Sequence, residues 1–166
     1  PFEPPLVLKP RFGSWGRDVL RARDQDELEH ALAEVRNRPW FRRHGALVQE
    51  LLPAHGRDLR LLVAGGRIVG AGERIAAPGE WRTNVSLGGS LRPLDPPPEA
   101  QELARTAAAA ADADLVGVDL LPLGGDRYAV LELDGAVDFD VGYALGGDLY
   151  LEIARALGLA EERSTS

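Results

Sequence analysis

The sequence predicts a mixed α+β fold, because antiparallel strand pairs are interleaved with single helices and no βαβ unit repeats. Segments 58–64 and 67–76 flank Gly65-Gly66, and such a two-residue turn between apolar runs is typical of a β-hairpin. Segments 115–121 and 128–134 are joined by a glycine-containing turn, so we expect a second antiparallel pair. These two pairs favour antiparallel sheets over a parallel sheet.

The first third of the chain predicts three strands and one helix. The strands are expected at 6–8, 19–20 and 46–52. Asp24 is a helix N-cap with Glu27 at the capping-box position. Apolar side chains then recur at helical spacing, which predicts a helix over 25–37.

The rest of the chain adds two helices and one long loop. An alanine-dense helix at 98–112 follows a run of three prolines, and proline fits the first helical turn. Spaced leucines and an isoleucine predict a last helix near 147–157. The polar stretch 78–89 is the longest candidate functional loop. The expected order is therefore β-β-α-β-β-β-α-β-β-α.

The composition excludes several classes of protein. The 166 residues have a formal net charge of −7, and 45% of them are hydrophobic. This balance is typical of a soluble globular protein and argues against nucleic acid or an anionic membrane as the main partner. The absence of cysteine excludes disulfides, thiolate metal sites and a cysteine nucleophile. No apolar run approaches the ~18 residues of a membrane span, and no signal peptide opens the chain, so we expect a cytoplasmic protein.

The first candidate site is a glycine-containing loop beside a lysine. Of the 19 basic residues, 18 are arginine, and the one lysine is Lys9, at the end of the first strand. The loop 11–17 contains Gly13 and Gly16, and such a loop can present backbone N–H groups to phosphate while the ammonium neutralises charge. It is not a Walker loop, because the Gly-Lys-Ser/Thr ending is missing. The alternatives are a lysine that snorkels at a sheet edge and a plain hairpin turn.

Three carboxylates form the second candidate site. Asp119 interrupts an apolar run, and Glu132 and Asp134 share a strand face because they are two residues apart. Pairing of Leu123 with Tyr128 around the turn would place Asp119 opposite Glu132. Three oxygen ligands without His or Cys suit a hard cation such as Mg²⁺ or Mn²⁺. The alternative is that these carboxylates line the solvated side of a hairpin.

The third candidate site is the loop Glu80-Trp81-Arg82-Thr83-Asn84. A guanidinium, a hydroxyl and an amide in succession suit a group that develops negative charge, such as a transferring phosphoryl group. The alternative is an ordinary solvated loop. Asp58 and Arg60 share one strand face and suggest a structural ion pair. The three histidines have no spacing that indicates a metal site, and we assign them no role.

In this order and spacing the motifs resemble the ATP-grasp superfamily, and specifically its RimK-like carboxylate–amine ligases, from Leu6 to about Leu159. The sequence Gly-Ser-Trp-Gly-Arg is more similar to the LysX-like branch, which serves lysine or arginine biosynthesis, than to the ribosomal-protein glutamate ligase. The matching segments are Lys9–Arg17 for the phosphate-covering loop, Val48–Leu52 for the adenine hinge, Gly56–Arg60 for a segment near the nucleotide, Glu80–Asn84 for the terminal phosphates, and Gly117–Leu120 with Leu131–Asp134 for the metal.

The resemblance implies an ATP-grasp fold and an ATP-dependent ligase with one or two Mg²⁺ (or Mn²⁺) ions. Such a ligase joins a small-molecule or carrier-protein carboxylate to an amino acid through an acyl phosphate. The implied nucleotide-binding residues are Lys9, Gly13, Ser14, Trp15, Gly16, Gln49, Glu50, Leu51, Asp58, Arg82, Thr83 and Asn84. The implied catalytic residues are Arg82 and Asn84, which would stabilise the acyl phosphate, and the implied metal ligands are Asp119, Glu132 and Asp134.

This sequence departs from the family pattern in two respects. Asp134 replaces the Asn of the family's Glu-x-Asn pattern and adds negative charge beside ATP. Family members also carry an N-terminal domain, so we expect this chain to be part of a longer protein. A non-catalytic ATP- and metal-binding module and a purely structural domain of the same fold stay open as alternatives, and so does a homo-oligomer of the full-length protein.

The resemblance also implies how the chain is divided. We expect residues 1–52 to form a small subdomain that contains the phosphate-covering loop and ends in the adenine hinge. Residues 53–160 would form the metal- and nucleotide-binding subdomain, and residues 161–166 would be a disordered tail.

Overall fold

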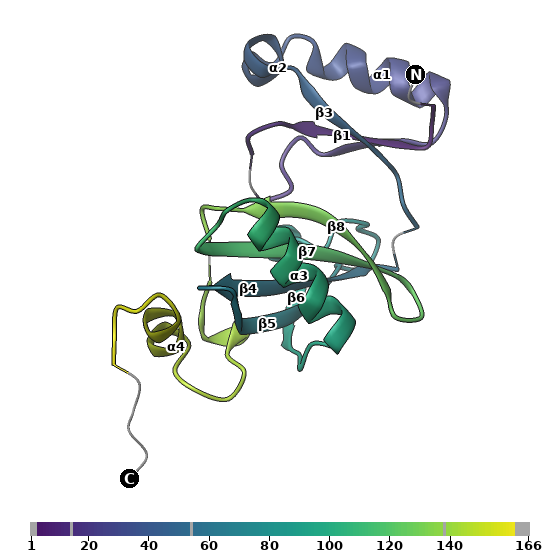
Figure 1. Ribbon diagram of the computed structural model, residues 1–166. Coiled ribbons are helices and arrows are strands. Elements are labelled where there is room, and N and C mark those ends of the chain that lie inside the picture. Colours follow the sequence, from purple (N-terminus) through teal and green to yellow (C-terminus); the bar gives the residue numbers. More distant parts are fainter. Residues whose placement is uncertain (1–2, 14, 54, 138, 162–166) are drawn as a thin grey trace. The chain divides into compact units, whose positions relative to one another are not determined.

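The computed structural model describes residues 3–13, 15–53, 55–137 and 139–161, and it divides the chain into two compact units (Figure 1). Unit 1 comprises residues 1–53 and unit 2 comprises residues 54–166, and each has its own sheet and apolar core. Of the expected tail, all residues after Glu161 lie outside the described part of the chain. The roles expected for the two parts stay predictions.

Unit 1 is a three-stranded antiparallel sheet with two helices. Its strands are β1 (Leu6–Pro10), β2 (Leu20–Ala22) and β3 (Ala46–Glu50), in the order β2-β1-β3. Its helices are α1 (Gln25–Val35) and α2 (Pro39–His44). The buried core of the unit includes Leu6, Leu8, Ala22 and Ala31, and Val35 of α1 is also buried.

Helix α1 begins at the predicted cap. The Asp24 carboxylate accepts the backbone N–H of Glu27 at 2.9 Å. The Glu27 carboxylate accepts the backbone N–H of Arg23 at 2.8 Å rather than that of the N-cap, and it also binds the Arg23 guanidinium. These hydrogen bonds from Arg23 hold the pKa of Glu27 at about 2.

Helix α2 was not predicted. It is six residues long, with Pro39 in its first turn, and it ends at Gly45, whose φ of 69° lies in the left-handed region. The indole N–H of Trp40 donates to the Asp18 carboxylate at 2.9 Å. A contact between segments 22 residues apart therefore anchors this helix to the loop that follows β1.

Unit 2 is built on a five-stranded antiparallel sheet in the order β6-β5-β4-β7-β8. Its strands are β4 (Arg57–Ala64), β5 (Arg67–Ile75), β6 (Ser90–Pro93), β7 (Leu115–Gly124) and β8 (Arg127–Asp134). The predicted hairpin at Gly65-Gly66 and the predicted antiparallel pair of β7 and β8 are confirmed. Strand β6 was not predicted, and the predicted polar loop before it contains a short 3-10 helix, η1 (Val85–Leu87).

The helices of unit 2 lie on both faces of its sheet. Helix α3 (Pro98–Ala110) packs on one face, over β4, β7 and β8 (Figure 1). On the opposite face, α4 (Leu149–Ala156) and the 3-10 helix η2 (Val141–Tyr143) pack against Leu62 and Ala64. The same face carries charged residues where β4 begins. Within the described residues, no helix has the length and apolar character needed to cross a membrane.

Candidate functional site

A set of charged residues, here called the polar face, lies on the side of the sheet opposite α3. Its members are Asp58, Arg60, Arg74, Asp119, Glu132 and Asp134. Cross-strand pairing places its members next to one another, since Asp58 is opposite Arg74, Arg60 opposite Asp119, Asp119 opposite Glu132, and Gly117 opposite Asp134. Directly opposed residues of an antiparallel pair point to the same side of the sheet. Four strands therefore contribute to one continuous charged surface.

The most buried part of the polar face is the pair of Asp58 and Arg74. The guanidinium of Arg74 donates to the two oxygens of Asp58 at 2.8 and 2.7 Å, and both side chains are less than a tenth exposed. The hydroxyl of Thr83 donates to the same carboxylate at 2.6 Å. The predicted nucleotide-binding residues Asp58 and Thr83 are therefore in direct contact.

Asp119 joins this pair to the neighbouring strands. It accepts one hydrogen bond from Arg74 at 2.8 Å and two from Arg60 at 2.7 and 3.0 Å. Burial alone would raise the pKa of Asp119, but the charges of Arg74 and Arg60 and their hydrogen bonds outweigh burial and hold this pKa below its usual value. The carboxylate is therefore ionised and compensated inside the sheet face.

The expected ion pair between Asp58 and Arg60 is wrong. The two residues do share a strand face, but Asp58 is bound by Arg74 on β5 and Arg60 binds Asp119 on β7. Residues two apart on a strand are about 7 Å apart, whereas directly opposed residues of neighbouring strands are about 5 Å apart. Each arginine therefore reaches a carboxylate of the neighbouring strand. Arg74 is the residue of this site that the sequence analysis did not identify, and Arg60 was predicted with the wrong carboxylate as its partner.

The predicted opposition of Asp119 and Glu132 is confirmed, although the strands reach it by another route. Tyr128 pairs with Pro122 rather than with Leu123, and a second irregularity after Asp119 restores the expected register. Glu132 is exposed.

The three predicted metal ligands have suitable chemistry, since all are carboxylates on one side of β7 and β8. Among the described residues, however, no three acidic or histidine side chains converge closely enough to hold a metal ion. Instead, Arg60 contacts two of the three, with its guanidinium 2.7 Å from Asp119 and 3.4 Å from Asp134. The metal assignment stays a prediction.

The loop 80–84 is held by its own charges. The Glu80 carboxylate accepts the backbone N–H groups of Trp81 and Arg82 at 2.8 and 3.0 Å and the Arg82 guanidinium at 2.8 Å. These bonds, led by the guanidinium, hold the pKa of Glu80 at about 2. The backbone oxygen of Asn84 accepts two N–H groups. A Cβ at Gly89 would lie 2.7 Å from the backbone oxygen of Thr83 and 2.9 Å from that of Ile75, so only glycine fits there. The loop is therefore tied to the polar face through Thr83 and shaped locally by Glu80.

The predicted phosphate-covering loop follows β1 in unit 1. Its described residues include Gly13, Trp15 and Gly16, while Ser14 lies outside the described residues. Lys9 is half-buried near the end of β1. Trp15 and Gly16 have φ values of 62° and 67°, in the left-handed region, and the Arg17 guanidinium lies 4.8 Å from the exposed Trp15 ring.

The predicted adenine hinge lies at the end of β3. Gln49 and Glu50 are the last residues of that strand, and the backbone N–H of Leu51 donates to the Pro5 oxygen at 2.9 Å. This segment comes directly before the boundary between the two units. Its contact with adenine stays a prediction.

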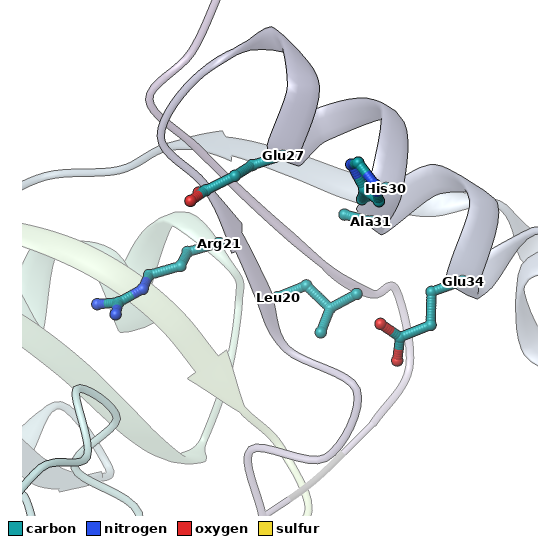
Figure 2. A pocket seen from close by; sticks show the side chains of 6 residues that line it. All are labelled: Leu20, Arg21, Glu27, His30, Ala31 and Glu34. Carbon is teal, nitrogen blue, oxygen red and sulfur yellow. The ribbon is translucent and has the colours of Figure 1, made fainter.

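A shallow hollow of about 230 Å³ lies between β2 and α1 (Figure 2). It is lined by Leu20, Arg21, Glu27, His30, Ala31 and Glu34. Glu27 is already paired with Arg23, and a ring nitrogen of His30 lies 2.7 Å from the Asp26 backbone oxygen. None of the lining residues belongs to a predicted site, and His30 keeps no assigned role.

The family model of the RimK-like ATP-grasp domain matches residues 1–157. The chain belongs to the RimK-like ATP-grasp family. A probable alpha-L-glutamate ligase of Parasynechococcus marenigrum is 35% identical over 165 residues, which cover 96% of this chain and 34% of the relative. The glutamate–LysW ligase ArgX of Sulfurisphaera tokodaii is 33% identical over 139 residues, which cover 81% of this chain and 48% of the relative. The chain thus spans between about a third and a half of these relatives.

Solved structures agree with the RimK-like assignment at the level of the fold. The crystal structure of D-cycloserine synthetase DcsG matches this chain with a TM-score of 0.64 at 20% identity, covering 93% of this chain and 56% of DcsG. The predicted α+β class and the ATP-grasp fold are therefore confirmed. The roles of individual residues stay predictions.

Proposed function

We propose that this RimK-like chain is the nucleotide- and metal-binding part of an ATP-dependent carboxylate–amine ligase. The observation that carries the proposal is the polar face, where Arg74 joins Asp119 to Asp58 and Asp58 is bound by the predicted phosphate-binding loop 80–84. Thr83 of that loop contacts the face directly, through its 2.6 Å bond to Asp58. Membership of a family whose compared relatives are named ligases supports the same function.

The proposed reaction has two steps. A carboxylate oxygen of one substrate attacks the γ-phosphorus of ATP, the bond to the bridging oxygen breaks, and ADP leaves. The amine of an amino acid then attacks the acyl carbon, phosphate leaves, and the amine proton passes to solvent. Such phosphoryl transfer depends mainly on positioning and on electrostatic stabilisation by the protein.

Different residues of this chain bind different parts of ATP. Lys9 neutralises the α- and β-phosphates, and the loop 13–16 covers them. The backbone of Glu50 and Leu51, next to Gln49, meets adenine. Arg82 and Asn84 face the γ-phosphate and the acyl phosphate.

One or two Mg²⁺ ions suit Asp119, Glu132 and Asp134, because hard cations bind carboxylate oxygens. When bound, the metal supplies positive charge between carboxylate and phosphate. This explains how a chain with a net charge of −7 accepts a polyanion.

The substrates follow by analogy with the relatives. Their names, alpha-L-glutamate ligase and glutamate–LysW ligase, support glutamate as one substrate. The second name also supports a carrier protein as the other partner. A small-molecule carboxylate is the competing choice.

Binding is tested on this chain by calorimetric titration with MgATP. We expect saturable binding that Lys9→Ala weakens about tenfold, a loss of about 1.4 kcal/mol. Arg36→Ala removes one exposed positive charge of the same unit and serves as the matched control. Absence of MgATP binding, or equal MgATP affinity of the two variants, would refute the proposed role of Lys9 in nucleotide binding.

Turnover is tested on the longest open reading frame that contains this chain. With glutamate, ATP and a panel of carboxylates, the proposal requires ADP and phosphate as products. An ¹⁸O label in the accepting carboxylate should appear in the released phosphate. Release of AMP and pyrophosphate would refute the acyl-phosphate route, and binding without turnover would leave a non-catalytic module.

A further inference from the structure

Arg60 occupies the place where the predicted metal ligands would need a cation. Its guanidinium lies 2.7 Å from an oxygen of Asp119 and 3.4 Å from an oxygen of Asp134. The arginine side chain is 11% exposed, and those of Asp119 and Asp134 are 8% and 28% exposed. A single guanidinium thus joins two carboxylates of neighbouring strands.

The backbone beneath Arg60 fits this arrangement. Gly117 is directly opposite Asp134, and a Cβ at position 117 would lie 3.7 Å from Nε and 3.8 Å from Cζ of Arg60. The same Cβ would lie 3.8 Å from the Cβ of Asp134. The guanidinium therefore lies against the strand at a position without a side chain.

The guanidinium groups of the polar face already compensate most of its carboxylates without metal. Asp58, Asp119, Glu132 and Asp134 supply four negative charges. Arg60 and Arg74 supply two positive charges, which contact Asp58, Asp119 and Asp134. A divalent cation that binds Asp119 and Asp134 needs the oxygens that Arg60 already contacts. It would also be repelled by the guanidinium at a few ångströms.

We propose that Arg60 is a positioning residue that competes with the divalent cation for Asp119 and Asp134. It holds the two carboxylates side by side without metal and disfavours binding of a free divalent cation. When the cation arrives together with nucleotide phosphates, these provide new negative charge for the displaced guanidinium. Cation and nucleotide therefore bind together more favourably than the cation alone. This inference rests on the proposed nucleotide- and metal-binding function.

The test measures Mn²⁺ binding rather than activity. The concentration of free Mn²⁺ is measured from its electron paramagnetic resonance signal. Each protein is titrated with Mn²⁺ alone and with Mn²⁺ plus a non-hydrolysable ATP analogue. The variants are Arg60→Gln and the control Arg57→Gln, which removes the same charge from the same strand. Arg57 is 55% exposed and pairs with Glu73 at 3.3 Å, away from the polar face.

Without nucleotide, Arg60→Gln should bind Mn²⁺ about tenfold more tightly than Arg57→Gln and the wild type. Arg60→Lys keeps the charge but lacks the planar fork, so it should give a smaller gain of about threefold. This second variant decides the question if circular dichroism shows that Arg60→Gln does not fold. A merely structural role for Arg60 would not tighten metal binding in either variant.

Two results would overturn the inference, and they differ in whether the proposed metal-binding function fails as well. If the wild type binds Mn²⁺ with the analogue, but the Arg60 variants bind Mn²⁺ alone no better than the control, then only the role of Arg60 fails. If no protein binds Mn²⁺ under either condition, the proposed metal function fails and this inference fails with it.

Discussion

Removing the arginine at the centre of the polar face should destabilise unit 2 strongly. Arg74 donates to both oxygens of Asp58, at 2.8 and 2.7 Å, and to Asp119 at 2.8 Å, and its side chain is 7% exposed. In Arg74→Leu, Asp58 keeps the hydroxyl of Thr83. Asp119 keeps the guanidinium of Arg60, so the larger loss falls on Asp58. Breaking a buried ion pair by removing one partner costs about 3–5 kcal/mol, and we expect about 4 kcal/mol here.

The assay must report on unit 2 by itself, because the chain has two units. Hydrogen exchange of the β4 amides in increasing urea gives the free energy of unfolding of this sheet. Arg92→Leu is the control, since Arg92 is 63% exposed and its pair with Glu73 should contribute less than about 1 kcal/mol. If Arg74→Leu costs no more than this control, the variant does not leave Asp58 as an uncompensated buried charge, and the reasoning is refuted. Arg74→Lys replaces Arg74→Leu in the assay if the leucine variant does not fold.

The same variant should change how stability depends on pH. The pKa of Asp119 lies below its usual value because Arg74 and Arg60 outweigh the effect of burial. Such a carboxyl stabilises the folded state above its unfolded pKa of about 3.9, and the contribution is lost as the pH falls below it. Arg74→Leu removes part of this lowering. The difference in unfolding free energy between wild type and variant should therefore shrink between about pH 5 and about pH 3, and a constant difference would contradict the pairing.

Two further predictions concern the hairpin turn at Gly65-Gly66 and the loop 80–84 of unit 2. A Cβ at Gly65 would collide with the backbone oxygen of Ala156, whereas one at Gly66 meets open space. Both glycines have positive φ, so urea unfolding should give a cost of about 3 kcal/mol for Gly65→Ala against about 1 kcal/mol for Gly66→Ala. Arg82→Ala should raise the pKa of Glu80 from about 2 toward its usual value, as an NMR titration of its carboxyl carbon would show. Because a lowered pKa stabilises the fold above the unfolded value, this variant should lose stability at neutral pH and lose less in acid.

The hairpin of β4 and β5 shows why most of the fold could be predicted. Its turn glycines and the apolar runs beside them lie within one short stretch of sequence, so no distant contact is needed to recognise it. Helix α2 and strand β6 lack such a local signal, because six and four residues are too few for a clear period. The contact between Trp40 and Asp18 that anchors α2 appears only in the folded unit.

The sequence predicted the carboxylates of the candidate site, but it gave Arg60 the wrong partner and did not identify Arg74. Asp119 was recognised because a charge within an apolar run is costly unless it is compensated. Its partner Arg60 is 59 residues away, and the contact exists only because β4 pairs with β7. Nothing in the sequence of either strand specifies that pairing, so the arginine was assigned to the nearest carboxylate, Asp58.

The bias toward arginine has a physical reason at this site. Arg60 and Arg74 each contact two carboxylates at once, which suits a planar fork and not the compact ammonium of lysine. Such a network adds little net stability, because desolvation offsets the attraction between buried ions. The stability of this sheet face must therefore come from its other half, where Leu62 and Ala64 pack with α4. A face divided in this way can exchange its ion pairs for a charged ligand while its apolar half keeps the strands in place.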